Sequence, residues 1–424
     1  MAAKISASLL PDNTTVSEDG MVIFAGIRAD DLAREYGTPL FVYDEEHIRR
    51  RCREAVVAFP DGASYATKAF LCKAMARLAY EEGMGLDVAT IGEAFTAIEA
   101  GVPAEKLVLH GNNKSIEELE YAKSQGIGKV VIDSFDEIKK IEQVFTKGAT
   151  PVKALIRITP GVEAHTHEYV ATGQEDSKFG FTVSTGLAQQ AIEAADNSKA
   201  IELIGIHAHI GSQIFTKESF RKATETLAEL SKLFALPELS VGGGLGVPYL
   251  NDEESISIAE WGNIVQGVCA ERGVKAEITA EPGRSIVASS SVTLYTVGTI
   301  KKLEGIRTYV AVDGGMHDNP RPALYGSDYE TFLPRAVESE RKLPITLVGK
   351  HCESGDVLVK EGSVPSDIAV GDLLATPVTG AYGHSMGSNY NKVLRPAVAF
   401  VKSGDARLVV RREELFDLLS NDVG

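Results

Sequence analysis

A regular alternation of short apolar runs and longer amphipathic stretches constrains the fold of this chain more than any other feature. Eight strand-like runs end near Lys68, Asp87, Gly111, Asp133, Pro160, Gly211, Gly242 and Glu281. Stretches with apolar residues at helical spacing lie between most of them, at 91–100, 115–125, 135–146, 185–197, 217–236 and 256–272. Eight strand–helix units in one unbroken block predict an α/β fold, a (β/α)8 barrel of the TIM type.

A doubly wound open sheet is the alternative, because periodicity alone does not show whether a sheet closes. The Gly-x-Gly-x-x-Gly pattern that usually follows the first strand of such a sheet is missing, which favours the barrel.

The pattern changes after Gly283. Short strand-like runs at 292–297, 308–312, 345–348 and 372–376 are separated by Gly, Pro and Asp, without long helices between them. They predict a second, β-rich domain resembling a β-barrel. We therefore expect a barrel over 40–283 and a β-rich domain formed by 1–39 and 284–424. The early strand at 39–43 is compatible with either domain.

Composition narrows the class of protein. The 424 residues carry a net charge of −16, which argues against nucleic acid or an anionic membrane as the main partner. No apolar run approaches membrane-spanning length, and the N-terminus lacks a signal-peptide core. The four cysteines show no paired zinc-type spacing, and such sparse cysteine is typical of a reducing cytoplasm.

Lys68 stands where the first barrel strand ends and a helical stretch is about to begin. α/β enzymes place catalytic groups at such strand ends. A lysine there can be a solvated charge, an ion-pair partner or an amine that forms a Schiff base.

Two histidines mark the sixth strand. His207 and His209 share one face if the strand continues through both. They are either satisfied core histidines or part of a site. A zinc site is a third option, but no third ligand occurs at an expected spacing. His165 and His167, in a polar loop, are expected to be solvated.

The seventh and eighth strands end in residues suited to an anion. Three consecutive glycines, 242–244, follow the seventh strand and let backbone N–H groups approach a phosphate, although a tight turn also uses glycine. Glu281 and Arg284 close the eighth strand. They form either a surface ion pair or a ring-nitrogen partner and an anion clamp.

A lysine at a strand end, a glycine phosphate cradle and an acid able to face a pyridine nitrogen together indicate a pyridoxal phosphate site on a barrel. The segments 65–69 (YATKA), 209–213 (HIGSQ), 242–246 (GGGLG), 281–284 (EPGR) and 352–356 (CESGD) resemble those of the diaminopimelate decarboxylase family. So do 111–115 (GNNKS), 177–180 (SKFG), 321–326 (RPALYG) and 388–391 (SNYN). The similarity runs from about residue 35 to residue 415, with the motifs in fixed order.

The resemblance implies a role for each matched residue. Lys68 would hold pyridoxal 5'-phosphate, Glu281 would face its ring nitrogen, His209 would lie against the ring and Asp87 would support the site. The phosphate ligands would be Ser212, Gly243, Gly244, Gly283, Arg284 and Tyr382. The substrate ligands would be Arg284, Arg321, Tyr325, Glu353 and Tyr382, with Glu353 on the remote ammonium. Cys352 would return a proton from the other subunit, which implies a homodimer with shared active sites.

The implied reaction is the decarboxylation of meso-2,6-diaminopimelate to L-lysine and carbon dioxide, the last step of lysine biosynthesis. Alternatives are a decarboxylase of the same fold for ornithine, arginine or carboxynorspermidine, a non-catalytic cofactor-binding barrel, or a barrel racemase. Arg321, Tyr325 and Glu353 favour diaminopimelate, whose remote end carries both a carboxylate and an ammonium. Phe70 and the pair Ser240-Val241 depart from the family's usual pattern.

Overall fold

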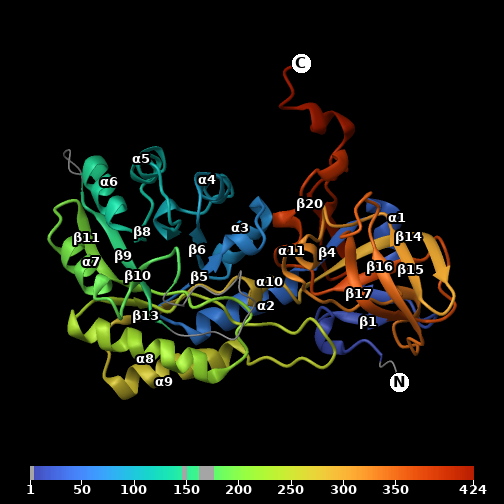
Figure 1. Ribbon diagram of the computed structural model, residues 1–424, viewed down its shortest axis with the longest axis horizontal. Coiled ribbons are helices and arrows are strands. Elements are labelled where there is room, and N and C mark those ends of the chain that lie inside the picture. Colours follow the sequence, from blue (N-terminus) through green and yellow to red (C-terminus); the bar gives the residue numbers. More distant parts are fainter. Residues whose placement is uncertain (1–3, 146–149, 162–175) are drawn as a thin grey trace. The chain divides into compact units, whose positions relative to one another are not determined.

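Eight parallel strands close into a barrel in one of the two compact units of the chain, the unit formed by residues 51–246 and 255–285 (Figure 1). The computed structural model describes residues 4–145, 150–161 and 176–424. The barrel strands are β5 (Gly62–Ala66), β6 (Gly85–Val88), β7 (Leu107–Leu109), β8 (Lys129–Ile132), β9 (Val152–Thr159), β11 (Ile201–His207), β12 (Glu238–Ser240) and β13 (Glu277–Ala280). A further short strand, β10 (Phe181–Thr182), pairs with β9.

Closure distinguishes this barrel from the open sheet. The last strand pairs with the first, since Thr279 and Ala280 of β13 lie opposite Gly62 and Ala63 of β5. The fourth and fifth strands, β8 and β9, also pair directly. The predicted (β/α)8 barrel is therefore confirmed, and so are all eight predicted strands.

Helices in the described part of the chain surround these strands (Figure 1). They are α3 (Lys73–Glu81), α4 (Ile91–Glu99), α5 (Ile116–Gln125), α6 (Phe135–Phe145), α7 (Leu187–Asp196), α8 (Lys217–Leu233) and α9 (Ile258–Arg272). Local sequence sets their ends. For example, Ser115 and Glu118 form a capping box at the start of α5, and Gly126 ends that helix in the left-handed conformation.

The helical layer packs through aromatic side chains. Trp261 of α9 is fully buried, with its ring centroid 4.6 Å from Phe59 and 5.5 Å from Phe220. Between strands, Val108, Val131 and Leu155 form a buried cluster. Burying such side chains contributes about 1.5–3 kcal/mol each, and this packing holds the strand ends in place.

The second unit comprises residues 1–50, 247–254 and 286–424. Its main sheet runs β17-β16-β15-β14-β4-β19-β20, with β18 paired to β14. These strands are β4 (Leu40–Asp44), β14 (Ser291–Leu303), β15 (Arg307–Val312), β16 (Leu343–Val348), β17 (Val357–Val364), β18 (Leu373–Pro377), β19 (Ala397–Lys402) and β20 (Asp405–Val410). The unit also contains the small sheet β1 (Thr14–Val16), β2 (Val22–Phe24) and β3 (Ile27–Arg28), together with α1 (Ala29–Tyr36) and α11 (Arg321–Tyr325).

The β-rich second unit was expected, but it also contains residues 40–50 and 247–254, which the prediction had placed in the barrel. The strand Leu40–Asp44 pairs antiparallel with β14 and parallel with β19, so it belongs to the β-rich sheet and not to the barrel over 40–283 in which it was placed. All five of its residues are buried, which the pairing on both edges explains. Among the described residues, no helix is both long enough and apolar enough to cross a membrane.

Candidate active site

Chemically active side chains collect at the carboxyl ends of the barrel strands. Parallel strands in a closed barrel bring these ends to one rim. Lys68 follows β5, Asp87 lies in β6, His110 follows β7, His207 ends β11 and Glu281 follows β13. Residues from positions 68 to 281 thus come together although they are far apart in sequence.

Glu281 lies between two imidazole rings. His207 Nε2 donates to Glu281 Oε2 at 2.8 Å, and His110 Nε2 donates to Oε1 at 3.1 Å. All three side chains are buried. Burial alone would raise the pKa of Glu281, but the charges and hydrogen bonds of His110 and His207 outweigh it and hold this pKa well below its usual range. Glu281 is therefore a buried carboxylate that stays ionised.

The two histidines differ in their protonation. Burial lowers the pKa of His207. Burial acts on His110 too, but the carboxylates of Asp87 and Glu281 outweigh it and raise the pKa of that ring. Asp87 Oδ1 lies 3.6 Å from His110 Nε2, and burial raises the pKa of Asp87. His110 is accordingly the more readily protonated of the two rings, and its Nε2 lies near both acids.

Lys68 is exposed, in a short 3-10 turn at Thr67–Ala69 directly after β5. Neighbouring residues fix the turn: Thr67 Oγ1 donates to the Asp87 carbonyl at 2.8 Å, and Tyr65 Oη donates to the Phe70 carbonyl at 2.7 Å. Phe70, which departs from the family pattern, is fully buried. The anchored turn thus presents the lysine amine at the rim.

The glycine loop after β12 packs tightly against neighbouring strand ends. A Cβ on Gly243 would clash with the Glu281 carbonyl oxygen, and one on Gly244, whose φ is +114°, would clash with the Gly211 carbonyl oxygen. Only glycine fits at such positions. His209, expected to share a strand face with His207, lies beyond the end of β11. Its Nδ1 instead accepts from Gly243 N at 3.2 Å.

Arg284 begins the short helix α10 (Arg284–Val287) and is buried. Its Nη2 donates to Ser212 Oγ at 2.8 Å, so two of the predicted phosphate ligands lie together. Burial, followed by the charge of Lys68, lowers the pKa of His209 well below its usual value, which makes that ring neutral. These groups fit pyridoxal phosphate. They are the amine of Lys68, the ionised Glu281, the neutral ring of His209, and Arg284 in contact with Ser212.

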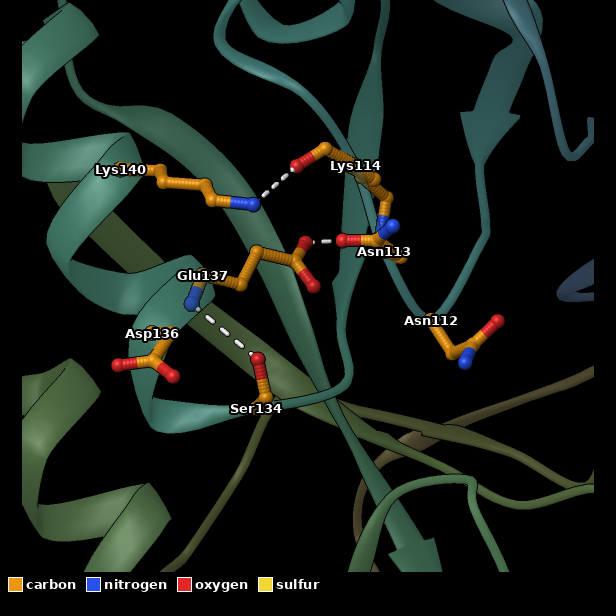
Figure 2. Close-up of a pocket in the computed structure, with 7 residues that line it drawn as sticks. All are labelled: Asn112, Asn113, Lys114, Ser134, Asp136, Glu137 and Lys140. Carbon is orange, nitrogen blue, oxygen red and sulfur yellow. Dashed lines mark hydrogen bonds and ion pairs between the residues drawn. The ribbon is translucent and has the colours of Figure 1, made fainter.

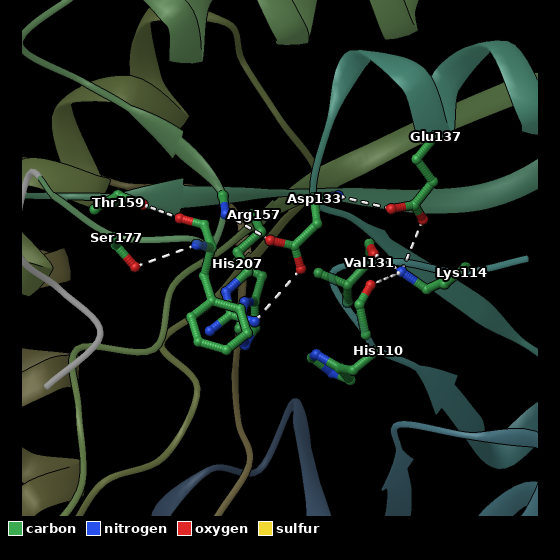
Figure 3. A network of polar contacts seen from close by, with 12 residues as sticks. His110, Lys114, Val131, Asp133, Glu137, Arg157, Thr159, Ser177 and His207 are labelled. Carbon is green, nitrogen blue, oxygen red and sulfur yellow. Dashed lines mark hydrogen bonds and ion pairs between the residues drawn. The ribbon is translucent and has the colours of Figure 1, made fainter. Parts of the chain in front are cut away.

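A network of buried charged side chains lies next to these strand ends (Figure 3). It explains the role of the segments GNNKS (111–115) and SKFG (177–180), which the sequence alone does not reveal. Lys114 Nζ donates to Glu137 Oε1 at 2.7 Å and to the Val131 carbonyl at 2.5 Å. Glu137 Oε2 accepts from the backbone N of Asp133 at 3.1 Å. The GNNKS segment therefore ties the end of β7 to the end of β8.

Arg157, on β9, continues this network. Its Nη1 lies 3.4 Å from Asp133 Oδ2, and its guanidinium lies over the ring of Phe179, 4.3 Å from the centroid. Asp133 Oδ1 also accepts from Gly180 N at 2.5 Å. The SKFG segment is thus fixed at the rim by Asp133 and Arg157. His165 and His167 lie outside the described residues.

A polar cavity of about 560 Å³ opens beside the GNNKS segment (Figure 2). It is lined by Asn112, Asn113, Lys114, Ser134, Asp136, Glu137 and Lys140. Its charged groups contact one another or nearby backbone: Lys114 pairs with Glu137, Asp136 pairs with Lys139, and Lys140 Nζ donates to the Lys114 carbonyl. These contacts make the cavity wall part of the structural support of β7 and β8.

Five predicted site residues belong to the β-rich unit. Arg321 is buried in α11, where its guanidinium lies 4.6 Å from the ring centroid of Tyr249 and donates to Tyr329 Oη at 2.5 Å. Tyr325 is the last residue of the same helix. Tyr382 is half-buried and has a φ of +61°, a conformation that residues other than glycine rarely adopt.

Cys352 and Glu353 lie in an exposed turn of this unit. Tyr390 Oη donates to Glu353 Oε2 at 3.0 Å. The other three cysteines, Cys52, Cys72 and Cys269, are buried, whereas Cys352 is exposed.

Sequence reasoning missed three features of the rim, namely His110, Arg157 and the role of His207. Nitrogen atoms of His110 and His207 and an oxygen of Glu281 lie within 4.8 Å of one another, a composition that also suits a metal ion. The sequence showed no third ligand near His207 because His110 and Glu281 follow other strands, and the spacing of residues along the chain does not show which strand ends are neighbours in the barrel. The position of His110 could have identified it as a site residue, because it directly follows β7 in the same way that Lys68 lies just after β5.

Known proteins share both the sequence and the fold. Residues 45–288 match the model of the pyridoxal-dependent decarboxylase family, pyridoxal binding domain. The diaminopimelate decarboxylase of Mycobacterium tuberculosis is 44% identical over 440 residues, which span 99% of this chain and 98% of that protein. The diaminopimelate decarboxylase of Bacillus subtilis is 44% identical over 423 residues, 96% of each chain.

A solved structure extends the comparison. The crystal structure of diaminopimelate decarboxylase from M. jannaschii in complex with L-lysine has a TM-score of 0.90 at 30% identity. The match covers 97% of this chain and 98% of that one. The likeness therefore includes the barrel and the β-rich unit.

Proposed function

Because the chain belongs to the diaminopimelate decarboxylase family, we propose that it converts meso-2,6-diaminopimelate to L-lysine and carbon dioxide with pyridoxal 5'-phosphate as cofactor. The observation that carries this proposal is the ionised Glu281, held between His110 and His207 at the end of a strand that pairs with β5, the strand that leads to Lys68.

The cofactor, when bound, supplies a ring that accepts the electrons left behind when carbon dioxide departs. Glu281 would accept a hydrogen bond from the protonated ring nitrogen and so keep the proton there. Lys68 would provide the amine that attaches the cofactor. Ser212 and Arg284, already in contact, would bind the phosphate together with backbone groups of the glycine loop. His209, neutral, would lie against the ring.

The remote end of the substrate would be recognised by charge. Arg321 would bind the remote carboxylate, since its planar guanidinium is fixed by Tyr249 and Tyr329. Tyr325 and Tyr382 would complete that contact. Glu353 would accept from the remote ammonium. Cys352 would donate the thiol proton to the carbon that has lost carbon dioxide, which leaves a thiolate on Sγ.

One assay tests the proposal directly. The purified protein, loaded with pyridoxal phosphate and incubated with meso-diaminopimelate, should release carbon dioxide and L-lysine in equal amounts. Equal turnover of L-ornithine or L-arginine would support the rival decarboxylase of the same fold. Release of no carbon dioxide from any of these amino acids would overturn the proposal.

Arg321→Ala is expected to lower kcat/KM for meso-diaminopimelate roughly a hundredfold or more, because removing one partner of a buried charge pair costs about 2–5 kcal/mol. Cofactor absorbance should not change, since Arg321 belongs to the substrate side of the proposed site. Arg307→Ala is the control, because Arg307 is exposed in the same unit. Unchanged kcat/KM in Arg321→Ala would remove this arginine from the substrate site.

The proposed enzyme is a homodimer in which Cys352 of one chain serves Lys68 of the other. Lys68→Ala and Cys352→Ala proteins, each inactive, should regain activity when mixed and allowed to exchange subunits. Random pairing makes half of the dimers mixed, with one intact site of two, so recovery should approach roughly a quarter of the wild-type activity. No recovery, with exchange verified by a mass tag, would place the thiol's action within its own chain or exclude it.

A further inference from the structure

The turn that carries Cys352 and Glu353 is fixed at its base. Asp356, which is buried, accepts from the backbone N of Met316 at 2.6 Å through Oδ1 and from that of His351 at 2.8 Å through Oδ2. The side chains of Cys352 and Glu353 are nevertheless exposed. Their orientation therefore depends on contacts beyond this base.

Those contacts come from the segment 388–391 (SNYN), which carries part of the family likeness but whose role the sequence alone does not reveal. Tyr390 Oη donates to Glu353 Oε2 at 3.0 Å. Asn391 Oδ1 lies 2.9 Å from His351 Nδ1, and because an amide oxygen only accepts, this nitrogen carries the proton. Two adjacent residues thus hold the turn at two points.

His351 links the two points. Its ring centroid lies 5.2 Å from that of Tyr390, and its Nε2 lies 2.9 Å from Nδ1 of the buried His317. The imidazole therefore has a hydrogen-bond partner at each nitrogen, and the Tyr390 ring packs against it. The phenol reaches Glu353 from a supported position.

The backbone of the segment is unusual. Asn391 and Lys392 have φ values of +52° and +57°, in the left-handed region that residues other than glycine rarely occupy. Such conformations persist where surrounding contacts determine them, and they occur often at functional sites. Here Ser388 N donates to the His317 carbonyl at 2.9 Å, and Asn389 Nδ2 donates to the Val393 carbonyl at 3.0 Å.

We infer that Tyr390 is a specificity-determining positioning residue, which orients the Glu353 carboxylate toward the remote ammonium group of the substrate. The inference rests on the proposed function, in which Glu353 binds that ammonium. A carboxylate accepts several hydrogen bonds, so the bond from Tyr390 leaves capacity for the ammonium. The hydrogen bond to Glu353 raises the pKa of Tyr390, which keeps the phenol protonated as a donor.

The test compares two ligands that differ only at the remote end. Meso-diaminopimelate has the remote ammonium, whereas 2-aminopimelate keeps the remote carboxylate and lacks the ammonium. Tyr390→Phe removes the hydroxyl and keeps the ring beside His351. We expect kcat/KM for meso-diaminopimelate to fall about tenfold, the usual effect of one hydrogen bond to a charged group. The competitive inhibition constant of 2-aminopimelate should change less than about twofold, because no ammonium is present for Glu353.

Two further variants sharpen the result. In a Glu353→Gln background, Tyr390→Phe should add no further loss, because both changes remove the same interaction. Tyr36→Phe is the matched control, since that phenol donates to the Ala406 carbonyl elsewhere in the same unit. Its kinetics should equal those of the wild type.

The outcomes separate this inference from the proposed function. A wild type that releases no carbon dioxide from meso-diaminopimelate would overturn both. An active wild type with unchanged kinetics in Tyr390→Phe would overturn the inference alone. Equal losses for the two ligands, or additive losses with Glu353→Gln, would show that Tyr390 only supports the fold, and would overturn it too.

Discussion

Replacement of Lys68 with alanine is expected to lower carbon dioxide release from meso-diaminopimelate by roughly a thousandfold or more, about 4 kcal/mol of transition-state stabilisation. The amine stands exposed on an anchored turn at the barrel rim, where it can react with an aldehyde. The variant should also lose covalent attachment of the cofactor. Borohydride reduction of the wild type, followed by peptide mapping, should place the pyridoxyl label on Lys68.

Two other lysines provide the comparison. Lys73 is exposed at the start of α3, a short distance further along the chain, so Lys73→Ala should retain activity and labelling. Lys114 is buried and donates to Gly111, Val131 and Glu137. A label on Lys73 or Lys114 would contradict the assignment.

Glu281→Gln is expected to lower kcat by roughly a hundredfold to a thousandfold, a loss similar to that of other fixed charges aimed at a reacting centre. The amide keeps the size of the side chain but loses the negative charge that would hold a proton on the ring nitrogen. The absorbance of the bound cofactor should change together with kcat. Wild-type kcat in this variant would remove Glu281 from the ring-nitrogen position.

The same substitution has a pH-dependent effect on stability in the cofactor-free protein. The pKa of Glu281 is held below its usual 4.5, so its contribution is present above pH 4.5 and is lost as pH falls through the lower folded value. The pKa of His110 is raised above 6.5, so its contribution is present below pH 6.5 and is lost as pH rises through the higher folded value. The Tm difference between wild type and Glu281→Gln should therefore be largest between pH 4.5 and pH 6.5.

Glu238 is a control for Glu281, because it is also a buried acid but lies at the amino ends of the barrel strands. Glu238 is the first residue of β12 and pairs with Lys129 at 2.5 Å. Glu238→Gln should cost stability without a comparable loss of kcat, since this carboxylate lies at the amino end of its strand. Equal losses of kcat in the two variants would make the effect of Glu281→Gln structural.

The barrel was predictable because its strands and helices have strong local signals. The strand Val152–Thr159, for example, is buried at every position except Lys153 and contains the apolar run 154–156, and the helices between such strands show the helical period. The β-rich unit was harder. Strand Val357–Val364 contains Lys360, Glu361 and Gly362, so its sequence does not read as a strand until β16 pairs with it. Strand Leu40–Asp44 was found, but its distant partners β14 and β19 were not predictable.

The sequence predicted where the site residues lie along their strands, but it did not predict which of them contact one another. Lys68 and Glu281 were proposed because each stands at the end of a strand, and Asp87 was proposed from the family resemblance. The pairing of Glu281 with His110 depends on how strands β7 and β13 are arranged around a closed barrel, which no spacing encodes. The hydrogen bond from Tyr390 to Glu353 likewise joins two loops 37 residues apart.

The position of β4 also imposes an order on biosynthesis. This strand lies inside its sheet between β14 and β19, yet it emerges from the ribosome about 250 residues before the first and about 350 before the second. At about 5–20 residues per second, the nascent chain spends roughly 12–50 seconds with both edges of an apolar strand unpaired. The barrel strands β5–β13 are all made within that interval. Until those partners are made, both edges of this strand are open to pairing with another chain, which makes the segment a starting point for aggregation when synthesis stalls.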